Sequence, residues 1–136
     1  MTTLLVDVAN VMGSRPDGWW RDRAGAAERL LERLAGLPGR VLDGPDGVAV
    51  HCSQVVAVVE GQAREAAGPE VSGLRVVRAP GSGDDALVAS AAELVAAGEE
   101  VLAVTADRGL RARLPDGVAV AGPGWLQARM PGDRDG

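Results

Sequence analysis

Acidic side chains stand where apolar segments of this sequence end. Three such segments stop at or just before an acid, so that each would deliver a carboxylate to the edge of a sheet. The acids are Asp7, Glu60 and Asp107, after the apolar stretches 3–6, 55–59 and 101–105. A Gly-Ser-Gly turn places two further carboxylates, Asp84 and Asp85, at the expected start of a helix. We therefore expect these carboxylates to converge on one site.

Carboxylates are the ligands that Mg²⁺ and Mn²⁺ prefer in proteins. Carboxylates that lie close together raise one another's pKa and cost stability, and a divalent cation between them removes that cost. Such a cation polarises a phosphoryl oxygen and lowers the pKa of its bound water, so a phosphodiester is cleaved without a side-chain nucleophile. The sequence therefore predicts a Mg²⁺ or Mn²⁺ site for hydrolysis, with the expected ligands Asp7, Glu60, Asp84, Asp85 and Asp107.

Several of these side chains have a structural interpretation that stays open. Ser82 and Asp85 have the spacing of a capping box, and the helix dipole favours acids at a helix N-terminus. Asp107 can cap the short helix that follows it, and Glu60 can simply end a strand. Because arginine binds phosphate through two parallel hydrogen bonds, Arg108 is a candidate for phosphate binding, and Ser82 is a second candidate.

Two adjacent tryptophans, Trp19 and Trp20, follow a loop signal at 13–18. One interpretation is that they stack on a nucleic-acid base. The other is that they pack the loop against the next helix, and we favour this structural role for at least one of them.

Strand and helix patterns alternate along the chain, which predicts an α/β fold. The strands that carry the acids are continuously apolar, as is typical of a parallel sheet covered by helices on both faces. The expected strands are 3–10, a strand that begins between 48 and 54 and ends at Glu60, 74–78, 101–105 and 118–121. The expected helices are 22–34, 84–97 and 108–114, with a short helix or turn at 61–68 and a short segment of unspecified structure at 125–130. We therefore expect a single three-layer α/β domain with a parallel sheet of about four to five strands, in which ligands bind outside the carboxyl ends of the strands.

The composition limits the classes of protein to which this chain can belong. All 14 basic residues are arginine and the net charge is −5, which argues against non-specific binding to a polyanion, although a metal ion reverses the sign locally. With one histidine, His51, and one cysteine, Cys52, a zinc site of these residues and an intrachain disulfide are excluded. No signal peptide and no apolar run of about 20 residues is present, so we expect a cytoplasmic protein without a membrane segment.

Three motifs, at 5–11, 83–88 and 104–110, together resemble the signatures of the NYN group within the PIN-like nuclease superfamily. The resemblance implies a flavodoxin-like, PIN-like sheet and a PIN-like domain over residues 1–130. From the sequence itself we expect 131–136 to be a flexible C-terminal tail. It further implies metal-dependent endonuclease activity, usually on RNA, which is the expected partner in single-stranded or structured form. The catalytic residues that carry over are Asp7, Asn10, Asp84 and Asp107.

Two rival functions remain open in the sequence. The same acids and metal would serve a small phosphohydrolase, such as a nucleoside triphosphate pyrophosphohydrolase. A PIN-like domain can also be a non-catalytic binding module, although the intact acids speak against that alternative. The sequence is compatible with a homodimer and does not identify the RNA.

Overall fold

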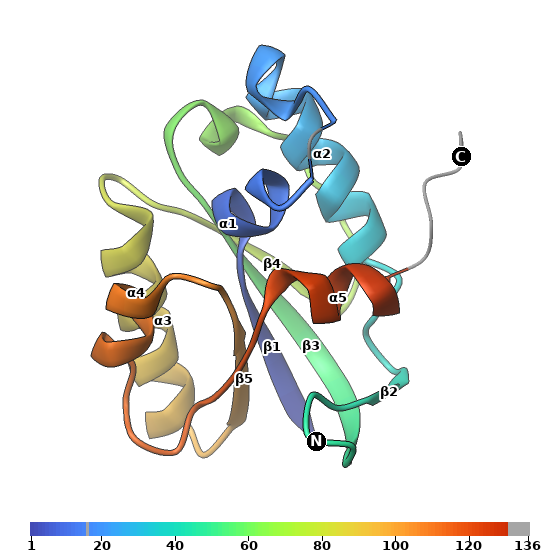
Figure 1. The fold of residues 1–136 in the computed structure, drawn as a ribbon, viewed down its shortest axis with the longest axis vertical. Helices are drawn as coiled ribbons and strands as arrows, with labels where there is room; N and C mark the ends of the chain where they lie inside the picture. Colours follow the sequence, from blue (N-terminus) through green and yellow to red (C-terminus); the bar gives the residue numbers. More distant parts are fainter. Residues whose placement is uncertain (16, 131–136) are drawn as a thin grey trace.

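Helices lie on both faces of a single sheet, so the chain forms three layers (Figure 1). The computed structural model describes residues 1–15 and 17–130. One face of the sheet is covered by α1 (Val8–Gly13), η1 (Trp19–Arg21), α2 (Arg23–Leu34), η2 (Gly61–Glu65) and α5 (Pro123–Arg129). The other face is covered by α3 (Gly83–Ala96) and α4 (Arg108–Arg113). The predicted three-layer α/β architecture is confirmed.

Strand β1 (Thr2–Asp7) lies in the middle of the sheet. It pairs in parallel with β3 (Ala49–Val59) on one side and with β5 (Glu100–Val104) on the other. β4 (Leu74–Arg78) extends the sheet beyond β3, and β6 (Ala119–Ala121) extends it beyond β5, both in parallel. The chain therefore builds one half of the sheet first, then crosses back over β1 to build the other half.

A short antiparallel strand, β2 (Val41–Asp43), makes the sheet mixed and brings it to six strands, beyond the predicted four to five. β2 pairs with the first residues of β3, with Val41 opposite His51. A tight loop joins the two strands, and in it Gly44 N donates to Val48 O at 3.0 Å. This hairpin occupies much of the segment 40–52, and β3 begins at Ala49, within the predicted range of 48 to 54.

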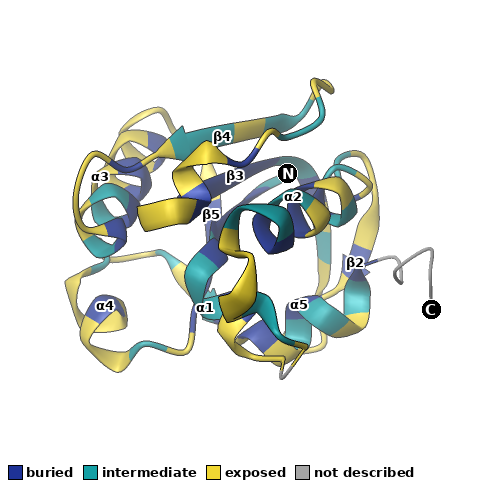
Figure 2. Cartoon of the chain, turned by 90° about the horizontal axis from the view of Figure 1, so that it is seen from above, coloured by how far each residue is buried: buried dark blue, intermediate teal, exposed yellow. Residues whose placement is uncertain are grey.

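Successive side chains of a strand point to opposite faces of the sheet. In β1, Leu4 and Val6 belong to the core beneath α1, α2 and α5, whereas Leu5 packs in the second core with Leu87 of α3. All three β1 side chains are fully buried, and Figure 2 shows the buried strands between helices whose outer sides are exposed. Burial on both faces explains why the strand is apolar without alternation.

The first strand is shorter than the predicted segment 3–10. It ends at Asp7, and Val8 already belongs to α1. Asp7 is the N-cap of α1, because its carboxylate accepts a hydrogen bond from Asn10 N at 3.2 Å. Val8 and Val11 are buried at helical spacing, but periodicity cannot separate so short an apolar run from a strand. The prediction of a strand through Asn10 is therefore wrong.

The other predicted elements are present, with ends that differ by at most three residues. The predicted helix 22–34 is α2, whose N-cap Asp22 accepts from Gly25 N at 2.9 Å. The predicted segment 125–130 falls in α5, which begins earlier because Pro123 suits the first turn of a helix. The segment 61–68 contains the 3-10 helix η2.

The predicted tail, 131–136, lies outside the described residues. Among the helices of residues 1–15 and 17–130, none combines the length and the apolar character that a membrane crossing requires.

Candidate active site

The sheet order places the ends of three acid-bearing strands side by side. β1 lies between β3 and β5, so the carboxyl ends of these parallel strands meet at one edge. Asp7 is the last residue of β1, Glu60 follows β3, and Asp107 follows β5 by three residues. The chain changes direction across the sheet between β1 and β5, and such a reversal is the usual ligand-binding position in α/β sheets.

Asp7 is held by hydrogen bonds to both carboxylate oxygens. Its Oδ1 accepts from Asn10 N at 3.2 Å, and its Oδ2 accepts from the Thr105 hydroxyl at 3.1 Å. Burial raises the pKa of Asp7, the two hydrogen bonds oppose that rise, and repulsion from Asp84 and Glu60 adds to it. Burial and repulsion make the ionised form of this carboxylate unfavourable, and a nearby cation would stabilise it.

Thr105 links the acids of β1 and of the loop after β5. Its side chain is buried, and the same hydroxyl that donates to Asp7 accepts a hydrogen bond from Asp107 N at 3.1 Å. Asp107 Oδ1 in turn accepts from Leu110 N at 3.0 Å, so Asp107 caps α4 as the structural interpretation predicted. Thr105 was not among the predicted site residues, although its place two residues before Asp107 was the available signal.

Asn10 fixes the loop between β5 and α4. Its Oδ1 accepts a hydrogen bond from Ala106 N at 2.8 Å, while its own backbone N–H donates to Asp7. Because Ala106 N is a donor, the side-chain oxygen of Asn10 is the group that faces it, and the amide nitrogen is directed elsewhere. Asn10 therefore positions the loop that carries Asp107.

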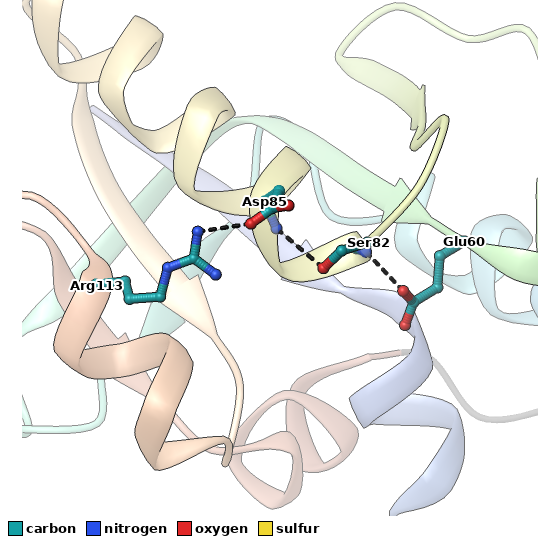
Figure 3. Close-up of polar contacts among 5 residues, drawn as sticks. Glu60, Ser82, Asp85 and Arg113 are labelled. Atoms are coloured by element: carbon teal, nitrogen blue, oxygen red, sulfur yellow. Dashed lines mark hydrogen bonds and ion pairs between the residues drawn. The ribbon is translucent and has the colours of Figure 1, made fainter.

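Glu60 anchors the start of α3. Its Oε2 accepts a hydrogen bond from Gly83 N at 2.6 Å (Figure 3). A Cβ atom on Gly83 would lie 2.6 Å from that oxygen, so a larger residue here would displace the Glu60 carboxylate from this hydrogen bond. Ser82 is the N-cap of α3, and its hydroxyl accepts from Asp85 N at 3.4 Å. The structure thus uses Glu60 and Ser82 to hold the turn that presents the acids of α3.

The two adjacent acids of α3 have different surroundings. Asp84 is half-buried, and burial, followed by repulsion from Asp107 and Glu60, raises its pKa, while Arg113 opposes the rise. Asp85 is exposed, and its Oδ1 lies 2.7 Å from Arg113 Nη2 (Figure 3). Asp84 therefore joins the electrostatic environment of Asp7 and Asp107, whereas Asp85 forms an exposed ion pair between α3 and α4.

The donor chemistry suits a hard divalent cation. The negative charges of Asp7, Glu60, Asp84 and Asp107 act on one another, and all are oxygen donors of the kind that Mg²⁺ and Mn²⁺ bind. The side chains are not already arranged as a metal site: among the described residues, no group of three or more His, Cys, Asp or Glu could hold a metal ion. Metal binding would thus require these side chains to turn toward one another.

Arg108, the predicted phosphate-binding arginine, is exposed at the first position of α4, beside Asp107. His51 is exposed on β3 and Cys52 is buried in the core, on the part of β3 far from the acids. Burial raises the pKa of the Cys52 thiol to about 11. Both residues therefore lie apart from the candidate site.

The comparisons with known proteins concern the fold. No protein-family model and no curated protein sequence matches this chain. The structure is similar to the crystal structure of a mutant of Rae1 (YacP) from Bacillus subtilis, with a TM-score of 0.58. The match has 15% sequence identity and covers 94% of this chain and 74% of Rae1. This likeness shows that the two chains share an α/β fold.

Proposed function

We propose that this chain is a metal-dependent endoribonuclease with its active site at the carboxyl edge of β3, β1 and β5. The observation that carries the proposal is the placement at this edge of carboxylates from four different segments of the chain, close enough to repel one another. Repulsion and burial both disfavour the ionised state of Asp7 and Asp84. A fold does not need such an arrangement, and a divalent cation compensates it.

The reaction follows from this donor set. A bound Mg²⁺ or Mn²⁺ supplies Lewis-acid activation of a phosphoryl oxygen and of an attacking water. Asp7, Asp84 and Asp107 are the residues that would hold the cation, and Glu60 adds negative charge while it anchors the start of α3. Thr105 and Asn10 act as positioning residues, because they hold Asp7 and the loop before Asp107.

Two of the sequence candidates have other roles in this proposal. Asp85 is left out of the metal-binding set, because its carboxylate pairs with Arg113. Ser82 caps α3 with its hydroxyl oxygen, so its main contribution is to the turn. The assignment of RNA as the substrate rests on the three sequence motifs, and the likeness to Rae1 (YacP) supports the PIN-like fold that those motifs imply.

The decisive experiment is a cleavage assay with purified protein and Mg²⁺, Mn²⁺ or a chelator. The substrates are single-stranded RNA, structured RNA and nucleoside triphosphates. We expect internal cleavage of RNA that needs metal and is lost in Asp7→Asn. The matched control is Asp116→Asn, which changes an exposed acid in the turn before β6, at the opposite edge of the sheet.

Other results of the cleavage assay would favour an alternative function or another source of the activity. Turnover of triphosphates alone would replace the proposal with a pyrophosphohydrolase. If neither substrate is consumed and calorimetry detects no Mg²⁺ or Mn²⁺ binding, the acids are helix caps and the chain is a non-catalytic module. Cleavage that persists in Asp7→Asn would assign the activity to a contaminant or to another site.

A further inference from the structure

A groove of about 1000 Å³ lies beside the acid cluster, between α1 and α5. It begins at Asn10 and Ala106, the two residues whose hydrogen bond ties α1 to the loop before Asp107. Because Asn10 also contacts Asp7 through its backbone N–H, the groove starts where the acid cluster ends. If a polymer is cleaved at the acids, the part of its strand next to the cleavage site can lie along this groove.

The charges in the groove are positive. Within the described part of the chain, its charged lining residues are Arg15 and Arg33. Arg33 Nη1 donates to Gln127 Oε1 at 3.0 Å, and this bond joins α2 to α5 in the lining of the groove. In a chain of net charge −5, these two arginines bring guanidinium groups, which bind phosphate well, to the lining of the groove.

A tryptophan surface continues the groove. A neighbouring recess shares Arg15, Arg33 and Gln127 with the groove. Its lining also includes Trp19 and one charge of each sign, Asp17 and Arg29. Trp19 is half-buried against the core, and Trp20 meets it edge to face, with the ring centroids 6.0 Å apart.

Trp20 is 52% exposed and is not part of the core. The Arg21 guanidinium lies 5.9 Å from its ring centroid. The packing role of the tryptophans thus belongs to Trp19, which leaves the exposed ring of Trp20 as a stacking surface for a base.

We propose that the groove and Trp20 bind the single-stranded RNA that flanks the cleavage site, with phosphates at Arg15 and Arg33 and a base stacked on Trp20. This inference rests on the proposed function for its choice of RNA. Single-stranded substrate follows from the tryptophan, because a duplex keeps its bases stacked inside and presents only phosphates and sugars to such a ring. An RNA duplex would use the arginines without Trp20.

The test measures binding apart from cleavage. A fluorescently labelled single-stranded RNA of twelve nucleotides is titrated into Asp7→Asn protein in Mg²⁺, and anisotropy gives the Kd. Adding Trp20→Ala should weaken binding about tenfold, the scale of one lost base–aromatic stack, and Trp20→Phe should recover part of it. Adding Arg15→Ala should reduce the slope of log affinity against log salt by about 0.7, the value for one phosphate contact on a single strand.

The matched control is Arg75→Ala, which removes another exposed arginine. Arg75 of β4 pairs with Val56, a residue of the α3 side of the core, so it lies on the face of the sheet opposite the groove. Its removal should change neither the Kd nor the salt slope. Circular dichroism of each variant confirms that the helices are retained.

The outcomes separate this inference from the proposed function. If wild-type protein cleaves RNA but Trp20→Ala and Arg15→Ala bind as tightly as their parent, the binding path is wrong and the nuclease proposal stands. If wild-type protein cleaves no RNA while Asp7→Asn binds it through Trp20 and Arg15, the path stands and the nuclease proposal falls. Duplex RNA that binds as tightly as the single strand, without dependence on Trp20, would also overturn the path.

Discussion

Thr105→Val tests whether one buried hydroxyl holds the candidate site together. The substitution replaces the hydroxyl with a methyl group of similar size, so it opens little cavity. It removes the hydrogen bond to the Asp7 carboxylate and the one that Asp107 N donates. A hydrogen bond to a charged group contributes about 1.5–3 kcal/mol and a neutral one about 1 kcal/mol. We therefore expect a loss of roughly 2.5–4 kcal/mol in the free energy of unfolding.

The same change should impair cleavage. The Thr105 hydrogen bond lowers the pKa of Asp7, so its loss leaves a carboxylate that burial and repulsion from Asp84 and Glu60 disfavour further. Partners that orient a metal ligand typically contribute about 10- to 100-fold to affinity or activity. Thr105→Val should therefore reduce metal affinity or RNA cleavage by a factor in that range.

The assay is urea unfolding at pH 8 without metal, followed by cleavage kinetics. Thr105→Ser is the control, because it keeps the hydroxyl and removes only the methyl group. A double-mutant cycle with Asp7→Asn isolates the coupling between the two side chains, and the Thr105→Val penalty should shrink in that background. A penalty below about 0.5 kcal/mol, the range of an ordinary surface substitution, would refute the account of Thr105 as the link between these strands.

Two further predictions concern the start of α3. Asp84→Asn should stabilise the metal-free protein at neutral pH. The pKa of Asp84 is raised in the folded state, so its contribution to stability is present at low pH and is lost as pH rises through the folded-state pKa. Thermal unfolding should show the gain at pH 7, its disappearance near pH 3, and a smaller stabilisation by Mg²⁺ than in wild type. Gly83→Ala should displace Glu60, since the added Cβ would lie 2.6 Å from Glu60 Oε2; we expect lower stability and less cleavage, and Gly81→Ala, at a glycine with open space around it, is the matched control.

The sequence was informative where a residue's type reflects its immediate environment. Continuously apolar strands that end in Asp7, Glu60 and Asp107 were sufficient to predict a parallel sheet with acids at one edge. Capping was likewise visible in the local spacing at Ser82. The pattern of apolar residues did not reveal α1, because the same few buried valines fit both a continued strand and a six-residue helix.

The contacts that decide the site are long-range, and local patterns do not encode them. The Thr105 hydroxyl and the Asp7 carboxylate are 98 residues apart in the sequence, and they meet only because β5 pairs directly with β1. Alternation of strand and helix predicts a parallel sheet without its strand order. The pairing of Asp85 with Arg113 across α3 and α4 was hidden for the same reason.

The central place of β1 also determines when the site can exist during synthesis. β1 precedes every other strand in the chain, yet one of its neighbours, β5, emerges from the ribosome only after most of the domain has been made. Pairings between segments so distant in sequence form late, because the intervening chain must first be brought together. A nascent chain without β5 lacks Thr105 and Asp107, so its Asp7 has no organised partners on that side. Any activity at this edge therefore begins only once the domain is nearly complete.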